Sequence, residues 1–201
     1  MKRIFFSLAL LLAVTTLIAQ TNMTAREAAV KIADRILAST TYEFKNTKTG
    51  ETYKSVKKLP LDMDVKVACK YNNWHYTNGV TNMALMELGD KLADKKYEKY
   101  VLKNMNFVFN EGNLEFFRKQ YDEAFKQDGW NAVRKLSWHM IFRGKRLDDN
   151  GPMGASLIEL QMRYPNQSFL DYVNETAEHL NYGEPLSLIH ISEPTRHAQI
   201  S

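Results

Sequence analysis

Apolar residues recur at the three- and four-residue spacing of an α-helix from Trp74 almost to the end of the chain. This spacing predicts a succession of amphipathic helices, whose apolar residues span Val80–Leu88, Tyr97–Val108, Leu114–Ala124, Val133–Met140, Met153–Leu160 and Phe169–Leu180. Strand patterns do not alternate with these helices, which excludes a parallel sheet assembled from strand–helix–strand units. We therefore expect an all-α fold.

The segment before Trp74 has a different pattern. Residues 24–38 form a predicted first helix, because Thr24 and Glu27 stand in the spacing of a capping box. The next residues, 39–73, are predicted to be extended chain around a turn at Asn46–Gly50. A connection of this length in a compact domain usually carries function or covers a site.

A weak internal repeat relates two parts of the helical region at a constant offset of 72 residues, so that Asn78-Gly79 corresponds to Asn150-Gly151. Each copy comprises a helix, a short turn and a second helix, which begins at Asp94 in the first copy and at Asn166 in the second. Helical hairpins that repeat in this way cannot bury their apolar faces alone, so they stack into a solenoid or close into a toroid. A chance similarity between amphipathic hairpins is the alternative.

The N-terminus has the pattern of a secretory signal peptide. Lys2 and Arg3 supply positive charge before the apolar run Ile4–Ile18, and Ala19 then offers a small residue for cleavage. This run is shorter than the roughly 20 apolar residues that span a bilayer, and a retained anchor is the alternative. We expect residues 1–19 to be removed and the mature chain to be periplasmic or secreted.

The C-terminal residues are predicted to be foreign to the gene. The segment Leu186–Arg196 resembles the translation of a transposase-type sequencing adapter along its whole length. We expect residues 186–201 to be adapter-derived, with a natural apolar tail as the alternative, and we leave them out of the fold. The domain of interest is then residues 20–185, and we expect the gene to continue beyond them.

Composition narrows the classes of function. A single cysteine among 201 residues excludes a disulfide framework, and no Cys or His cluster has zinc-ligand spacing. The formal net charge of +4 includes charged residues in both excluded ends, and the remaining lysines are interleaved with Glu and Asp. Such a pattern is typical of a solvated helix surface. We expect no nucleic-acid partner, and no membrane contact after signal cleavage.

Two loop-to-helix junctions carry the candidate chemistry. In the first, Asn72–Gly79, Trp74 and Tyr76 lie immediately before a predicted helix N-terminus, where aromatic faces can stack on a sugar ring. Free backbone N–H groups at such an N-terminus can hold a carboxylate. The alternative is a pair of core aromatics, with Thr77 or Asn78 as the helix cap.

The second junction, Arg146–Gly154, contains the adjacent carboxylates Asp148 and Asp149 at a predicted helix start. One of them can cap the helix while the other faces a cavity, or the pair can be an ordinary capping site. The helix N-terminus lowers the pKa of a carboxyl group, whereas an apolar pocket raises it. His139, in the preceding predicted helix, is a candidate substrate contact, with a satisfied core histidine as the alternative.

Three stretches of this sequence carry a family resemblance: W-H-Y-T-N-G-V, D-K-K-Y-E-K-Y-V and, as the most specific, R-L-D-D-N-G-P-M-G-A-S-L-I-E-L. They resemble glycoside hydrolase family 105, the unsaturated rhamnogalacturonyl hydrolases, which are related to the unsaturated glucuronyl hydrolases of family 88. The resemblance covers residues 24–185. It implies an (α/α)6 toroid, of which this chain holds roughly the N-terminal half.

The resemblance also implies an activity. Polysaccharide lyases leave a C4=C5 double bond on the uronic acid at the new non-reducing end, and enzymes of this family remove that sugar. An aspartic acid protonates C4, water adds at C5, and the resulting hemiketal opens and expels the rest of the chain, without a metal or organic cofactor. Ordinary glycoside hydrolysis attacks the anomeric carbon instead. The implied partner is an unsaturated pectic oligosaccharide of the rhamnogalacturonan type.

Carried over by position, Asp149 is the expected catalytic carboxylate and Asp148 the second choice. Trp74, Tyr76 and His139 are the expected substrate contacts. The family's principal acid lies further on, in a W-x-D-type motif that has no counterpart here, so we expect this chain by itself to be inactive and poorly folded. Two alternatives are a non-catalytic exported helical protein that binds glycans or scaffolds a complex, and a glycosidase of the same fold that acts on saturated substrates.

Overall fold

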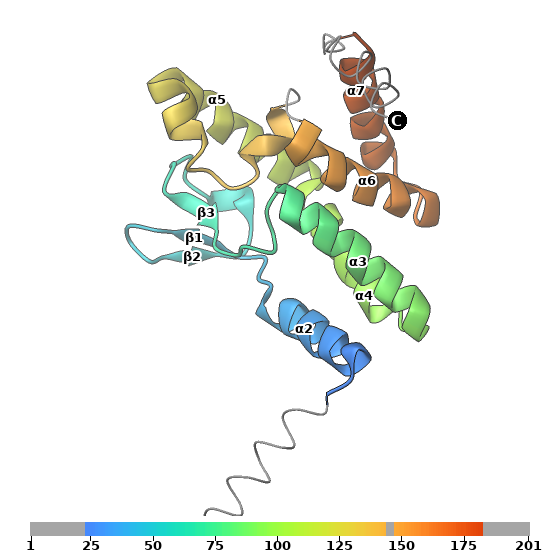
Figure 1. The fold of residues 1–201 in the computed structure, drawn as a ribbon. Helices are drawn as coiled ribbons and strands as arrows, with labels where there is room; N and C mark the ends of the chain where they lie inside the picture. Colours follow the sequence, from blue (N-terminus) through green and yellow to red (C-terminus); the bar gives the residue numbers. More distant parts are fainter. Residues whose placement is uncertain (1–22, 144–146, 183–201) are drawn as a thin grey trace, which may run out of the picture. The chain divides into compact units, whose positions relative to one another are not determined.

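The computed structural model describes residues 23–143 and 147–182, which are mostly helical, with six α-helices and three short β-strands (Figure 1). The high helix content and the small amount of strand agree with the predicted all-α class. The chain divides into two units, residues 1–39 and residues 40–201. The predicted signal peptide and the predicted adapter-derived tail lie outside the described residues.

The first unit contains α2, which spans Ala25–Ser39. Thr24 and Glu27 form the capping box that their spacing predicts. The Thr24 backbone N–H donates to Glu27 Oε2 at 2.8 Å, and the Glu27 N–H donates in return to Thr24 Oγ1 at 3.2 Å. The bond from the Thr24 backbone also lowers the pKa of the Glu27 carboxyl, because it stabilises the charged form.

The second unit begins with a small antiparallel sheet in the order β2-β1-β3 (Figure 1). Its strands are β1 at Phe44–Asn46, β2 at Thr52–Tyr53 and β3 at Val65–Val67, and a short 3-10 helix, η1, follows β2 at Val56–Lys58. The predicted turn is confirmed, because Asn46 Oδ1 accepts from the backbone N–H of Lys48 at 2.9 Å and Gly50 takes a positive φ of 77°. The sheet itself was not part of the prediction for this extended segment.

The rest of the unit is helical. Its elements are α3 at Tyr76–Leu92, α4 at Lys96–Val108, α5 at Glu111–Val133, η2 at His139–Phe142, α6 at Leu147–Arg163 and α7 at Gln167–Tyr182. Among the helices in the described ranges, none combines the length and the apolar character that crossing a membrane requires.

The predicted helix over Val133–Met140 is wrong. The backbone leaves helical geometry at Gly129 (φ 51°, ψ −131°), and α5 ends at Val133. Trp138 then adopts a left-handed conformation (φ 62°) before the single turn of η2. Val133, Leu136 and Met140 are all buried, so their helix-like spacing reflects core packing of an irregular segment.

The two segments that the predicted repeat relates each contain two helices in contact, α3 with α4 and α6 with α7. Asp94 Oδ1 accepts from the backbone N–H of Lys96 at 3.0 Å, and Asn166 Oδ1 accepts from that of Ser168 at 2.9 Å. Each bond satisfies a free N–H at the start of the second helix of its hairpin. The sequence correspondence between the copies thus extends to the local hydrogen bonding.

The two hairpins meet where α3 packs on α6, and these helices run in the same direction (Figure 1). At their N-terminal ends, a Cβ added to Gly79 would lie only 2.3 Å from the carbonyl carbon of Pro152. At their C-terminal ends, Arg163 Nη2 lies 2.8 Å from Asp90 Oδ2. Only glycine permits the backbones to approach this closely at position 79.

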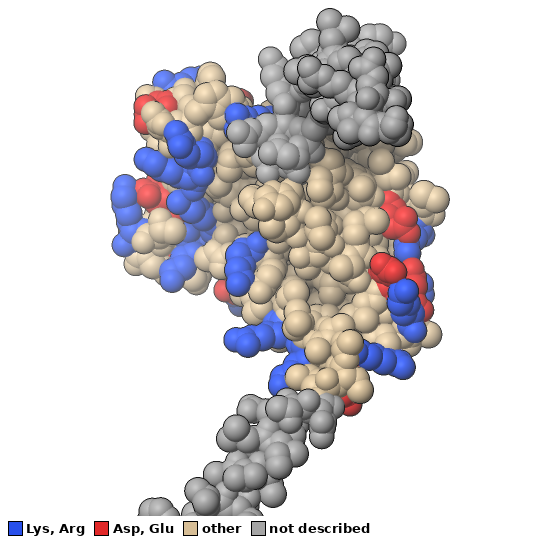
Figure 2. Space-filling view, in the orientation of Figure 1, with Lys and Arg blue, Asp and Glu red and all other residues tan. Residues whose placement is uncertain are grey.

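The buried face of α3 is not the face that its apolar residues predict. The residues of α3 that face the core are Asn78, Gly79, Asn82, Leu85, Met86 and Gly89. In contrast, the side chains of Val80 and Met83 are 56% and 38% exposed. Figure 2 shows the surface over α3 as largely uncharged. Gly79 lies against α6 and Asn78 bonds to loop carbonyls, and a hydrophobicity pattern identifies neither position.

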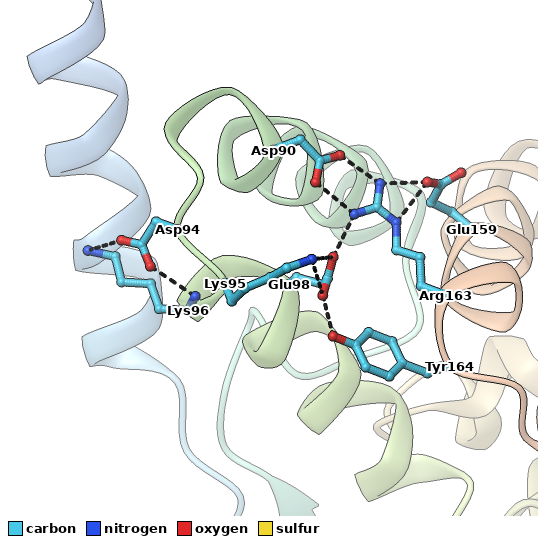
Figure 3. Close-up of polar contacts among 8 residues, drawn as sticks. All are labelled: Asp90, Asp94, Lys95, Lys96, Glu98, Glu159, Arg163 and Tyr164. Carbon is cyan, nitrogen blue, oxygen red and sulfur yellow. Dashed lines mark hydrogen bonds and ion pairs between the residues drawn. The ribbon is translucent and has the colours of Figure 1, made fainter.

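A charged network ties the end of α3 and the start of α4 to the C-terminal end of α6 (Figure 3). The Arg163 guanidinium contacts Asp90, Glu98 Oε2 at 2.6 Å and Glu159 Oε1 at 2.6 Å. Glu98 is 2% exposed and also accepts from the Tyr164 hydroxyl and from Lys95 Nζ at 3.2 Å. These donors hold the pKa of Glu98 below its ordinary value, with the Tyr164 hydrogen bond as the largest cause.

The small sheet packs against the helices through Phe44. Its ring centroid lies 5.7, 5.8 and 5.9 Å from those of Phe107, Phe116 and Phe117 on α4 and α5. The Gln120 side chain, which is 2% exposed, donates to the Val65 carbonyl at 2.8 Å and so fastens α5 to β3. The irregular N-terminal part of the unit is therefore fixed to the helical core.

Candidate functional site

The two junctions that the sequence singles out meet in the structure. Trp74 Nε1 donates to Asn150 Oδ1 at 2.9 Å, and Asn150 Nδ2 donates to the Arg143 carbonyl at 3.0 Å. Both Trp74 and Asn150 are buried, at 1% and 4% exposed. Asn150 therefore connects the start of α6 both to the loop before α3 and to the end of η2.

Asn78 plays the equivalent part at the start of α3. Its Nδ2 donates to the carbonyls of Lys70 at 2.9 Å and Asn73 at 2.8 Å, so it holds the loop that precedes its own helix. Asn150 holds the preceding loop through Arg143 in the same manner. The sequence identifies the repeated Asn-Gly pair but does not predict that its asparagines hold the loops before their helices. The recurrence of this pair at an offset of 72 residues is the pattern that could have indicated the shared role.

The loop before α3 also contacts a strained residue. Asn73 Oδ1 accepts from the backbone N–H of Trp138 at 2.8 Å, which holds Trp138 in its left-handed conformation (φ 62°). Bulky residues rarely adopt this conformation, and surrounding contacts must maintain it. Among the atoms that the structure describes, the buried Trp138 Nε1 and Asn72 Oδ1 have no hydrogen-bond partner.

Trp74 is a core residue. Its ring centroid lies 5.1 Å from Tyr172, 6.3 Å from Phe109 and 6.5 Å from Trp138, and its side chain is 1% exposed. The prediction that the face of Trp74 stacks on a sugar is therefore wrong for this structure, because its rings are covered by other aromatic side chains. The alternative of a core aromatic is the one observed.

Tyr76, in contrast, is available to a ligand. It is the first residue of α3, and its side chain is 47% exposed beside the His75 ring at a centroid distance of 4.6 Å. His75, not Thr77 or Asn78, caps this helix, because His75 Nδ1 accepts from the Thr77 backbone N–H at 3.3 Å. The sequence did not mark His75, since histidine is an uncommon cap.

His139 lies at the start of η2 and not inside a long helix. It is half-buried, and its Nδ1 lies 3.0 Å from the Leu136 carbonyl oxygen. A carbonyl only accepts, so Nδ1 carries the hydrogen in this pair. This contact positions the ring by a backbone bond, as expected for a satisfied core histidine, and no observation of this structure links His139 to a substrate.

Asp148 and Asp149 lie in the first turn of α6. Their side chains lie outside the described part of the structure. Because α3 and α6 run in the same direction, their N-termini lie at the same end of the pair. The partial positive charge of such helix ends favours an anion nearby.

The described ranges hold no group of three or more His, Cys, Asp and Glu side chains that could bind a metal ion. In comparisons with known proteins, no family model matches the chain, and no curated protein matches it. The family resemblance therefore rests on the sequence motifs themselves.

Proposed function

We propose that this chain is the N-terminal part of a glycoside hydrolase that removes the unsaturated uronic acid from the non-reducing end of lyase-generated pectic oligosaccharides. One observation supports the proposal above others: the W-H-Y-T-N-G and R-L-D-D-N-G-P-M-G motifs, which carry the family resemblance, meet through the Trp74–Asn150 hydrogen bond. Residues that serve one reaction have to converge in space, and these motifs are far apart in the sequence.

We further propose that the helices belong to an (α/α)6 toroid. Such a toroid places the first helices of successive hairpins side by side in one direction and returns the chain through the second helices. Here α3 packs directly on α6 and runs in the same direction, with α5 and η2 between the two pairs in the chain. This arrangement supports the toroid, and further hairpins would be needed to close it.

In the proposed reaction, the carboxylic acid of Asp149 gives its proton to C4, water adds its hydroxyl to C5, and the remaining proton of that water replaces the one that Asp149 gave. The resulting hemiketal at C5 then opens and releases the remaining saccharide, so water is consumed and the double bond disappears. Asp148 is the second choice for this acid. Tyr76 supports the site as an exposed aromatic contact at the same helix end, while Trp74 acts by holding the two junctions together.

Two experiments test the proposal. Sequencing the source DNA across the codon for Pro185 should reveal a reading frame that continues into further helical hairpins and a second aspartate motif. The protein encoded by that longer frame should consume the ultraviolet absorbance of an unsaturated rhamnogalacturonan disaccharide, whereas the chain of 201 residues should not. A protein that binds the disaccharide but leaves its absorbance unchanged would favour the alternative of a glycan-binding protein.

A further inference from the structure

A pocket of about 560 Å³ lies between α5, η2 and α7. Among the described residues that line it, neither Trp74 nor Tyr76 is present. Aromatic and cationic side chains come from α5 and η2, and hydroxyl and carboxylate side chains come from α7. The residues that the argument uses are Arg118, Tyr121, Trp130, Arg143, Asp171 and Glu175.

Two guanidinium groups of this pocket lie over aromatic rings. Arg118 Cζ is 4.7 Å from the centroid of Phe142, and Arg143 Cζ is 4.2 Å from the centroid of Trp130. Among the side chains that the structure describes, neither guanidinium is paired with a carboxylate. An arginine held by its flat face keeps the N–H donors at its edge for a planar carboxylate ligand.

An exposed aromatic surface adjoins these cations. Trp130 is 41% exposed, and the Tyr121 ring packs edge-on against it at a centroid distance of 6.4 Å. Burial raises the pKa of Tyr121, and the nearby charge of Arg143 opposes part of that rise. Rigid aromatic rings of this kind offer a flat apolar face to the C–H surface of a sugar.

The α7 side of the pocket has the opposite character. Asp171 and Glu175 are exposed carboxylates, and Ser168 and Thr176 add hydroxyl groups. Carboxylates and hydroxyls accept hydrogen bonds from sugar hydroxyls, but these carboxylates repel another anion. A ligand that fits both sides therefore carries its negative charge at one edge and hydroxyl groups at the other.

We propose that this pocket binds one uronic acid unit of an acidic saccharide. Its carboxylate lies against Arg118 and Arg143, its ring contacts the exposed part of Trp130 beside Arg143, and its hydroxyls donate to Asp171 and Glu175. This binding goes beyond the proposed hydrolysis, because it requires neither a C4=C5 double bond nor Asp149. A saturated uronate is therefore a sufficient ligand, and loss of the hydrolytic function leaves the binding intact.

The test is a titration of the full chain with saturated digalacturonate, followed by tryptophan fluorescence and by calorimetry. Of the three tryptophans, Trp74 and Trp138 are each 1% exposed, so Trp130 is the one that a ligand in the pocket can contact. We expect saturable binding that weakens at least tenfold in Arg118→Met and in Arg143→Met. In Trp130→Phe the fluorescence change should disappear while calorimetry still detects weaker binding.

Two controls make the result specific. Lys119→Met removes a neighbouring cation of α5 that is paired with Glu115 and does not line the pocket, so it should bind as the parent does. Neutral galactobiose should not bind, because it lacks the carboxylate. Far-ultraviolet circular dichroism confirms that each variant is helical. Equal binding of galactobiose, equal losses in Lys119→Met and Arg118→Met, or no binding to the folded parent would overturn the proposal.

Discussion

The indole Nε1 of Trp74 donates to Asn150 Oδ1 at 2.9 Å and thereby joins two motifs that lie 76 residues apart in the chain. Neither residue is a group that reacts with a sugar, and both are buried. Their bond fixes the relative position of the loop before α3 and the first turn of α6, which carries Asp148 and Asp149. The aromatic part of the first motif thus acts by positioning the second.

Removing this bond should destabilise the protein. In Asn150→Ala, Trp74 Nε1 loses its partner in the core and the Arg143 carbonyl loses its partner at a partly buried position. We expect the free energy of unfolding to fall by about 3 kcal/mol, because each buried unsatisfied group costs roughly 1–3 kcal/mol. Urea unfolding followed by circular dichroism measures this loss. Asn174→Ala, at an exposed position of α7, is the control, and an equal loss there would contradict the role given to Asn150.

Because α3 packs closely on α6, adding one methyl group at position 79 should strongly lower the stability of the protein. In Gly79→Ala, the new Cβ would lie 2.3 Å from the Pro152 carbonyl carbon, so the two helices must move apart. Overpacking of this kind costs about 3 kcal/mol, measured as a lower melting temperature. Gly154→Ala on α6 meets nothing within 4 Å and should instead stabilise the helix slightly. Similar melting temperatures for the two variants would show that the helices are not in contact at Gly79.

The network around Glu98 predicts a stability that depends on pH. The pKa of Glu98 is lowered in the folded protein, so its contribution is present above the unfolded pKa near 4.5 and is lost as pH falls through the lower folded value. Glu98→Gln should cost about 2 kcal/mol at pH 7, because it removes the buried charge that accepts from Arg163, although Asp90 and Glu159 still pair with Arg163. The difference between the parent and this variant should then shrink as the solution is acidified below pH 4.5.

A matched control is Glu115→Gln, which removes an exposed carboxylate that pairs with Lys119 at 2.6 Å on α5. Exposed pairs of this kind contribute little, so its melting temperature should stay close to that of the parent. Melting curves of the parent and the two variants between pH 3 and pH 7 measure how the stability difference of each variant depends on pH. A constant difference between the parent and Glu98→Gln across this range would show that the charge of Glu98 is not what stabilises the contact.

Local rules predicted several elements of this structure well. The capping box at Thr24 and Glu27 forms as its spacing indicates, and so does the turn after Asn46. The 72-residue repeat located the two hairpins, and it placed Asp94 and Asn166 just before their second helices. These features depend on hydrogen bonds between residues close in sequence, which a sequence pattern encodes directly.

Features that depend on contacts between residues far apart in the sequence could not be predicted from local sequence patterns. Trp74 and Tyr76 are two residues apart, yet Trp74 is 1% and Tyr76 is 47% exposed, because only the former points at other aromatic rings. On α3, position 79 requires glycine because its backbone lies against Pro152, which is distant in sequence. The helix expected around Leu136 fails because Trp138 is held in a left-handed conformation by Asn73, and no local pattern marks that bond.

Tyr76 and Trp74 should respond differently to mutation in the longer enzyme that we propose. Tyr76→Ala removes an exposed ring at the proposed site, so we expect KM to rise about tenfold, which corresponds to roughly 1.4 kcal/mol, with little change in melting temperature. Trp74→Ala removes a buried ring and should lower the stability by about 4 kcal/mol. Steady-state kinetics and thermal melting distinguish the two roles. A large drop in stability for Tyr76→Ala would contradict its assignment as a substrate contact.

The central claim is that Asp149 protonates C4 of an unsaturated uronide. The most direct measurement follows the ultraviolet absorbance of an unsaturated rhamnogalacturonan disaccharide in the presence of the protein from the full reading frame, its Asp149→Asn variant and its Asp148→Asn variant. The account predicts that the absorbance disappears with the parent, that Asp149→Asn loses at least a hundredfold in rate, and that Asp148→Asn loses less. Normal turnover by Asp149→Asn, or disaccharide that stays unsaturated with the parent protein, would contradict the claim.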